Sequence, residues 1–428
     1  MAHRERLSGF DMNLIELALA AEAFVQQQPV IQQTTAQCVR TKNVHAACDR
    51  CAALCPTGAI RLDSGLPELT PEQCIKCGVC LHTCPLGVFE RPDGFQRLLS
   101  NAHSLREHEV VDIACVRHPA PQTTAPAVAG VVQTKNCLAE LGVSAWVGLL
   151  AVGVEQVRVR LDACAECPLR VLYPSIEQGI AATRQLLAEL DRADAVVPVY
   201  AADADWVERP LHHNTPARLS RRGLFASLVS PEAAVQQQAI NLIDEGDGCD
   251  QLSRERRRLL KVLRLLTEQM PDLPEAARLD GAGFVQLVVS DACNACGLCE
   301  RVCPTAALHV TKTDDQFMVI FAAQRCLDCH LCVDYCEPRA LTVYGAPSLR
   351  HVLDEARLLL HTGHMKECTR CQTRFAGSPE QTLCPTCTFR REHPSGVHLP
   401  EAVLAQLPAA TRERLLAVNA NRASAPEA

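Results

Sequence analysis

The sequence predicts a multidomain α+β protein in which two small cysteine-rich segments flank a central α/β domain, with a third cysteine-rich module after them. Three observations support this prediction. Cysteines gather in two pairs of short runs, the stretch between those pairs alternates strand-like and helical segments, and two CxxC pairs lie near the C-terminus. The length of 428 residues also favours about three domains, because single hydrophobic cores stop growing well below this size.

Composition excludes some classes of partner. Aromatic residues make up 4% of the chain and the formal net charge is -7, whereas nucleic-acid binding needs a basic footprint and stacking platforms. We therefore expect no nucleic-acid partner. The longest apolar stretches, such as 143–154, fall short of the roughly 20 residues that span a bilayer, so no membrane insertion is expected.

The chain begins MAHRER, without the apolar region and small-residue cleavage site of a secretory signal. The segment SRRGLF at 220–225 resembles a twin-arginine export motif, but such signals are read at the N-terminus, so it is expected to be a linker or docking segment. The 25 cysteines are therefore expected in a reducing, cytoplasmic compartment.

The expected domains follow from the cysteine runs and from hydrophobic periodicity. They are an N-terminal helix at 1–30, a first cysteine-rich segment at 31–95, an α/β domain at 105–203, a linker and helical segment at 204–280, a second cysteine-rich segment at 281–346, a zinc-ribbon-like module at 365–391, and a C-terminal helix and tail at 392–428. The α/β domain is expected to have strands at 110–114, 128–133, 157–161 and 195–200 and helices at 138–152 and 176–190.

Three further helical expectations concern the connecting segments. Residues 236–270 predict a helical segment with a solvated arginine face. A short helix is expected over 348–361 and another over 400–418.

The second cysteine-rich segment carries the clearest motif. It reads Cys293-x2-Cys296-x2-Cys299-x3-Cys303-Pro304, followed by Cys326-x2-Cys329-x2-Cys332-x3-Cys336. Three thiolates at this spacing lie on one tight loop and can hold three corners of an iron–sulfur cubane, while the fourth thiolate comes from elsewhere in the fold. Zinc-binding CxxC pairs are the alternative.

This double run resembles bacterial two-cluster ferredoxins, in which the fourth cysteine of each run ligates the other cluster. The resemblance implies a ferredoxin-like 2[4Fe–4S] domain with one cluster on Cys293, Cys296, Cys299 and Cys336 and the other on Cys326, Cys329, Cys332 and Cys303. Glu337-Pro338 follows the last cysteine where the family usually has proline, which is a small departure.

The first cysteine-rich segment combines a complete run, Cys74-x2-Cys77-x2-Cys80-x3-Cys84-Pro85, with an irregular one, Cys48-x2-Cys51-x3-Cys55-Pro56. His45 occupies the first ligand position of the irregular run, so either its imidazole binds iron or Cys38 reaches back across a longer loop. We favour Cys38, because four thiolates suit a low-potential cubane; a lost or three-iron cluster is the remaining alternative. The ferredoxin resemblance then implies clusters on Cys38, Cys48, Cys51 and Cys84 and on Cys74, Cys77, Cys80 and Cys55.

The expected α/β domain contains Cys115, Cys137, Cys164 and Cys167. Cys115 and Cys164 directly follow predicted strands, and the carboxyl ends of parallel strands form the functional edge of such sheets. The four thiols could meet there and bind a [2Fe–2S] cluster, or they could be ordinary buried thiols or a dithiol. The region loosely resembles the small iron–sulfur subunit that couples hydrogenase to heterodisulfide reductase. Cys249 is isolated and is expected to be free.

The C-terminal pattern Cys368-x2-Cys371-x12-Cys384-x2-Cys387 is a zinc-ribbon signature. Two CxxC pairs can also hold a single iron, as in rubredoxins, but zinc outcompetes iron in closed thiolate sites. The module is too small for a core of its own, so the metal would be structural and the module could dock a partner protein.

The favoured function is a polyferredoxin that relays electrons between partner oxidoreductases through four [4Fe–4S] clusters. The partners would be dehydrogenase, hydrogenase or reductase subunits, and a carrier or redox-complex subunit is favoured over a stand-alone enzyme. No dinucleotide fingerprint, P-loop or nucleophile elbow is present, so no catalytic residue is expected. Two alternatives stay open: a subunit of a flavin-linked electron-confurcating complex, and an accessory subunit that helps mature a molybdenum-dependent formate dehydrogenase. The histidines at 212, 213, 361 and 364 are expected to be surface residues.

Overall fold

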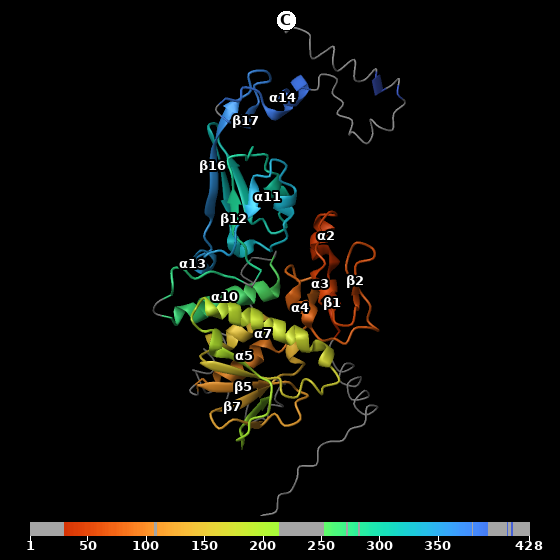
Figure 1. Ribbon diagram of the computed structural model, residues 1–428, viewed down its shortest axis with the longest axis vertical. Coiled ribbons are helices and arrows are strands. Elements are labelled where there is room, and N and C mark those ends of the chain that lie inside the picture. The colour runs from red at the N-terminus through yellow and green to blue at the C-terminus, as the bar shows by residue number, and fades with distance from the viewer. Residues whose placement is uncertain are drawn as a thin grey trace, which may run out of the picture. The chain divides into compact units, whose positions relative to one another are not determined.

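The structure is a computed structural model (Figure 1) that describes residues 30–106, 109–213, 252–270, 273–280, 283–378, 380–392, 409 and 412–413. The helix expected within 1–30, the segment at 220–225, Cys249 and nearly all of the helix expected over 400–418 lie outside these residues. The chain divides into two compact units. Unit 1 comprises Met1–Gln286, Ala322–His330 and Tyr344–Ala356, and unit 2 comprises Leu287–Phe321, Leu331–Val343 and Arg357–Ala428.

The first cysteine-rich segment, which belongs to unit 1, has short elements because cysteine loops interrupt them. They are β1 (Gln32–Gln33), η1 (Thr35–Gln37), α2 (Val39–Lys42), α3 (Arg50–Ala53), β2 (Ile60–Arg61), β3 (Glu68–Leu69), α4 (Val79–Thr83) and β4 (Phe89–Glu90). The outermost strands, β1 and β4, pair antiparallel, and β2 and β3 form a hairpin between the two cysteine runs. The β1–β4 pairing brings the two ends of this segment together, with the cysteine loops between them.

The centre of unit 1 is a five-stranded parallel sheet in the order β11-β7-β5-β8-β9 (Figure 1). Its strands are β5 (Val110–Ala114), β7 (Gly130–Gln133), β8 (Gln156–Arg160), β9 (Val196–Val199) and β11 (Leu211–His213). Val111, Ile113, Val131 and Val132 have no exposed surface, as expected for parallel strands covered on both faces. The segment that starts at 204 was expected to be a connection, but it supplies the edge strand β11 because Leu211, His212 and His213 pair with β7.

The helices around this sheet are α5 (Phe95–His103), α6 (Val143–Ala151), α7 (Tyr173–Ala188) and α10 (Arg254–Glu268), with single turns at η2 (Leu138–Glu140), η3 (Arg170–Leu172) and η4 (Ala193–Ala195). A small antiparallel pair, β6 (Thr123–Thr124) and β10 (Val207–Glu208), lies outside the sheet. Helix α6 is buried along nearly its whole length and contacts α5, α7 and α10. It is therefore the central helix of unit 1.

Helix α10 corrects one expectation, because its arginine face is not solvated. Ser253 caps the helix by accepting a hydrogen bond from the Arg256 amide. Arg256 and Arg258 are only 6% and 4% exposed. The Arg256 guanidinium lies 3.6 Å over the Phe284 ring and donates to the Gly283 carbonyl at 2.6 Å. Burial lowers the pKa of Arg256 to about 10.

Unit 2 contains the antiparallel pair β12 (Leu287–Val289) and β15 (Leu341–Val343) and a four-stranded antiparallel sheet in the order β13-β14-β16-β17. The sheet strands are β13 (Leu308–Lys312), β14 (Gln316–Phe321), β16 (Leu358–Glu367) and β17 (Arg374–Ala376), and the helices are α11 (Leu298–Val302), α12 (Leu331–Asp334) and α14 (Pro385–Glu392). Strand β16 ends one residue before Cys368, so the sheet leads directly into the C-terminal cysteine module.

The helix expected over 348–361 is wrong beyond its first turn. Only Leu349–Leu353 is helical, as α13 of unit 1, and the chain from Leu358 is the strand β16. Pairing with β14 decides this conformation: the Phe317 ring packs so closely on Gly363 that a Cβ there would lie 2.3 Å from it. Among the described residues, no helix has both the length and the apolar character needed to cross a membrane.

Candidate iron–sulfur and metal-binding sites

Three of the four cysteine runs share one backbone conformation. The residues on either side of the middle cysteine adopt left-handed φ angles in each of these runs. They are Lys76 (52°) and Gly78 (87°), Ala295 (52°) and Gly297 (76°), and Asp328 (53°) and His330 (60°). This conformation costs a residue with a Cβ about 1–3 kcal/mol, so its repetition around three cysteine loops indicates a functional constraint.

The irregular run of the first ferredoxin domain lacks this conformation. The corresponding cysteine is Cys48, and neither Ala47 nor Asp49 beside it has a positive φ. Arg50 and the three residues after it form α3, so Cys51 lies within a helical turn. The run with irregular cysteine spacing therefore has a loop conformation different from that of the other three runs.

A second repeated feature follows the fourth cysteine of every run. The residue three positions later has a left-handed φ in all four cases: Gly58 (64°), Gly87 (69°), Ala306 (52°) and Arg339 (50°). This turn brings the next amide back to the cysteine sulfur, so Val88, Ala307 and Ala340 donate to Sγ of Cys84, Cys303 and Cys336 at 3.5, 3.2 and 3.2 Å. Hydrogen bonds to sulfur stabilise a thiolate and tune an iron–sulfur cluster. Sequence reasoning missed this feature, whose only signal is the spacing from each fourth cysteine.

The thiols of the first ferredoxin domain gather in two groups. Burial raises the pKa of Cys51 to about 11, and the negative charges of Cys84, Cys48 and Cys38 add to this. Burial also raises the pKa of Cys80, with further contributions from Cys77, Cys74 and Cys55. These influences associate Cys51 with Cys38, Cys48 and Cys84, and they associate Cys80 with Cys55, Cys74 and Cys77. His45 is exposed.

In the second ferredoxin domain, one group lies wholly in unit 2. Burial raises the pKa of Cys299 to about 11, and Cys296, Cys293 and Cys336 raise it further. Of the remaining cysteines, Cys303 and Cys332 also belong to unit 2. Cys326 and Cys329 belong to unit 1, where the Cys326 carbonyl accepts a hydrogen bond from Arg256 at 3.0 Å.

Three cysteines of the central domain follow the carboxyl ends of adjacent parallel strands. Cys115 comes directly after β5, Cys137 lies between β7 and η2, and Cys164 lies after β8. A hydrogen bond between the Cys115 and Cys137 thiols lowers the pKa of Cys115 and raises that of Cys137. Burial raises the pKa of Cys164 to about 12, and nearby Cys115 and Cys167 add to it. The structure therefore collects all four thiols at one edge of the sheet.

Backbone amides also point at two of these central sulfurs. The Arg117 amide donates to Cys115 Sγ and the Leu169 amide donates to Cys167 Sγ, each at 3.4 Å. Thiols that receive amide hydrogen bonds in this way are typical of thiolate ligands to iron–sulfur clusters.

The C-terminal module has a tighter arrangement. The sulfurs of Cys368, Cys371, Cys384 and Cys387 all lie within 4.8 Å of one another. A hydrogen bond from the Cys384 amide lowers the pKa of Cys368 to about 6. Cys368, Cys384 and Cys387 are buried with Phe375, and Leu383 packs against them. Four convergent thiols suit a single tetrahedral ion, whereas a cluster with several irons holds its thiolates further apart.

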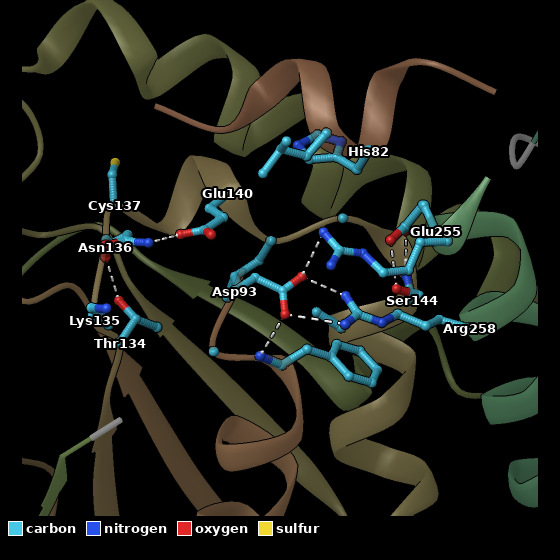
Figure 2. Close-up of a pocket in the computed structure, with 17 residues that line it drawn as sticks. His82, Asp93, Thr134, Lys135, Asn136, Cys137, Glu140, Ser144, Glu255 and Arg258 are labelled. Carbon is cyan, nitrogen blue, oxygen red and sulfur yellow. Dashed lines mark hydrogen bonds and ion pairs between the residues drawn. The ribbon is translucent and has the colours of Figure 1, made fainter. Parts of the chain in front are cut away.

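A small cavity in unit 1 lies beside Cys137 (Figure 2). Its volume is about 40 Å³, which is room for a few water molecules and too little for an organic substrate. Two of its carboxylates have hydrogen-bond donors: Asp93 accepts from Arg258 at 2.6 Å, and Glu255 accepts from the Ser144 hydroxyl at 2.6 Å (Figure 2). The cavity is therefore a small space between packed elements of unit 1.

Cysteine loops with left-handed residues around the middle thiol, and amides bonded to the fourth, define these domains as ferredoxin-type iron–sulfur domains. The family comparison agrees. Residues 46–88 match the 4Fe-4S dicluster domain and residues 287–309 match the 4Fe-4S binding domain. The chain is thus polyferredoxin-like, with two 4Fe-4S domains that support a role in electron transfer.

Similar curated proteins have related names. The chain is 30% identical over 66 residues to a subunit of the Na(+)-translocating ferredoxin:NAD(+) oxidoreductase complex of Acetobacterium woodii, which is 15% of this chain and 20% of that protein. It is 35% identical over 75 residues to the electron transport protein HydN of Escherichia coli, which is 17% of this chain and 41% of that protein. It is 42% identical over 43 residues to a subunit of the ion-translocating oxidoreductase complex of Methanosarcina acetivorans, which is 10% of this chain and 16% of that protein.

The chain therefore spans less than half the length of these curated relatives. No solved structure matches it.

Proposed function

We propose that this chain relays electrons between partner oxidoreductases through four [4Fe–4S] clusters held by its two ferredoxin domains. One observation carries the proposal. The turn after the fourth cysteine occurs in all four runs, and in three of them an amide donates to that cysteine's sulfur. Sulfurs that receive such hydrogen bonds bind a cluster as thiolates and influence its potential.

Each proposed cluster takes three thiolates from one run and one from the other run of its domain. In the first domain, the mutual electrostatic influence of Cys38, Cys48, Cys51 and Cys84 supports Cys38 as the ligand that completes the irregular run. Bound clusters supply one-electron redox chemistry. The protein's part is to hold the thiolates, donate amide hydrogen bonds to them and bury them from water.

The central thiols are proposed to hold a [2Fe–2S] cluster, which would give unit 1 a further one-electron site. The support is the convergence of Cys115, Cys137 and Cys164 at the carboxyl edge of the sheet, together with the amides that face Cys115 and Cys167. Ligands in parallel-sheet folds bind at this edge.

The C-terminal module is proposed to hold zinc. Its four sulfurs lie within the reach of one ion, and three of them form most of the module's small core. The metal would hold the module together, because so few apolar residues cannot stabilise it alone.

The partners are proposed to be redox proteins. The relatives in the two complexes are named as subunits of oxidoreductases, and the third is named as an electron transport protein. A cytoplasmic location is part of the proposal and agrees with a cluster chemistry that needs reducing conditions.

Anaerobic purification followed by iron, labile-sulfide and zinc analysis tests this assignment. Four cubanes predict about sixteen iron atoms per chain, a further [2Fe–2S] cluster predicts about eighteen, and loss of the irregular cluster predicts about twelve. An iron content below about eight, or iron without labile sulfide, would contradict the proposal. Reduction of an organic substrate by the purified chain without any partner would contradict the carrier role.

A further inference from the structure

Arg91 is a buried cation beside the loop that carries Cys77. Only 2% of the residue is exposed, and its Nη1 donates to the Lys76 carbonyl at 2.6 Å. Lys76 directly precedes Cys77, so the guanidinium lies against the cysteine loop itself. On the other side of Cys77, a Cβ on Gly78 would lie 3.0 Å from Arg91 Nη2.

Glu140, the last residue of η2, is the partner of Arg91. Nη2 of Arg91 lies 3.1 Å from Oε2 of Glu140, and Nε donates to Oε1 at 3.4 Å. The pair is almost completely buried, because the two side chains are 0% and 8% exposed. Both charges therefore interact strongly with neighbouring charged groups, because the effective dielectric constant is low in a buried site.

The same carboxylate also contacts the segment that leads into Cys137. Asn136 donates its amide to Glu140 Oε2 and directly precedes Cys137 (Figure 2). A second link runs beside it, since the His82 ring and the Ala139 carbonyl are hydrogen-bonded at 3.0 Å. His82 is a residue of α4, two positions after Cys80. A continuous buried path thus connects the Cys77 loop to Cys137.

A reduced [4Fe–4S] cluster carries one more negative charge than an oxidised one. A buried cation nearby therefore favours the reduced state, and a buried anion opposes it. The effect is not screened by salt as it would be at the surface.

We propose that Arg91 and Glu140 are positioning residues that set the reduction potential of the cluster held by Cys55, Cys74, Cys77 and Cys80. Arg91 raises this potential and Glu140 lowers it. The inference rests on the proposed function, since it requires a cluster at these thiols.

Redox titration of the anaerobic full-length chain, followed by EPR, tests the inference. Arg91→Gln is expected to lower the equilibrium constant for reduction of this cluster at least tenfold, which is 59 mV for one electron. Glu140→Gln is expected to raise it at least tenfold. The double variant carries neither charge, and its equilibrium constant for reduction of the cluster is expected to be within about threefold of the wild-type value. Arg184→Gln is the matched control, because it breaks an exposed ion pair between Arg184 of α7 and Asp194 of η4.

The outcomes are distinct. Opposite shifts in the two single variants support the inference. If both single variants keep their iron and their equilibrium constants for cluster reduction stay within threefold of the wild type, the inference is wrong. The proposed electron-transfer function would be unaffected by that result. If Arg91→Gln fails to fold with its clusters, the other two variants decide, because Glu140→Gln keeps an oxygen that can accept from Arg91 and the double variant leaves neither charge buried. A wild-type chain in which no cluster can be reduced would refute the proposed function itself.

Discussion

Arg160 and Asp162 form a two-bond ion pair at the carboxyl end of β8. Nε of Arg160 donates to Oδ1 of Asp162 at 2.9 Å and Nη2 donates to Oδ2 at 2.8 Å. Arg160 also pairs with buried Asp112 on β5 at 3.3 Å, and the His118 ring lies 3.1 Å from Asp162. Because Cys164 follows Asp162 by two residues, this network fixes the loop that carries Cys164 and Cys167.

Loss of this arginine is expected to loosen the central sheet. Arg160→Gln leaves Asp112 and Asp162 without their shared cation, and breaking a buried ion pair costs about 3–5 kcal/mol. Hydrogen exchange of the β5 and β8 amides measures the local free energy of opening. Arg184→Gln, which breaks an exposed pair, is expected to cost less than about 1 kcal/mol. Equal effects in the two variants would show that the network does not hold the sheet.

The Asp93 carboxylate predicts a pH dependence. Burial raises its pKa, but hydrogen bonds from Arg258 and the charges of Arg258 and Arg254 outweigh this and lower it below its ordinary value. A lowered pKa in the folded state stabilises the fold above the unfolded pKa of about 3.9, and this stability is lost as the pH falls through the folded value.

Asp93→Asn is therefore expected to lower the free energy of unfolding at pH 7 by about 2–3 kcal/mol. The difference from the wild type should shrink as the pH falls below about 4. Denaturation of the full-length chain, followed by circular dichroism at several pH values, measures this. Asp194→Asn is the control, because Asp194 is 91% exposed; a difference that does not change with pH would contradict the assignment.

The irregular cluster gives a prediction about Cys38 and His45. Cys38→Ser is expected to remove about one to four iron atoms from the chain and to change the EPR spectrum of the reduced protein. His45→Ala is expected to leave both unchanged, because His45 is exposed. The reverse pattern would make His45 the ligand. No effect of either variant would mean that the irregular run holds no four-iron cluster.

The C-terminal module is expected to depend on its metal. Cys371→Ser is expected to reduce the zinc content by about one atom per chain and to unfold the module, since its core consists of Cys368, Cys384, Cys387 and Phe375. The iron content and the visible spectrum of the clusters should not change. Metal analysis and proteolysis at 365–391 check this, with Cys249→Ser as a control. Loss of iron in place of zinc would identify a rubredoxin-like site.

Some of the architecture was accessible from the sequence because it depends on local spacing. The run Cys74-x2-Cys77-x2-Cys80 has a spacing that predicts three sulfurs on one loop, and left-handed residues flank its middle cysteine in the structure. The buried strand β5 (Val110–Ala114) has the bounds that its apolar run predicts. Features of this kind depend on residues that are close together in the sequence, so the sequence pattern alone predicts them.

Other features depend on partners that are distant in sequence. The helix expected over 348–361 overlaps the start of β16, where pairing with β14 accompanies an extended chain over Leu358–Glu367. The arginines of α10 are polar in sequence, yet Phe284 and Asp93 bury Arg256 and Arg258. The Arg91–Glu140 pair joins residues 49 positions apart. None of these contacts leaves a periodic signal in the sequence.

The most direct test of electron relay is to count the electrons that one chain accepts. Coulometric titration of the anaerobic protein, with EPR at each step, is expected to give about four one-electron reductions, or about five if the central thiols also hold a cluster. Uptake of fewer than about two electrons per chain, in protein that contains its full complement of iron, would contradict the account.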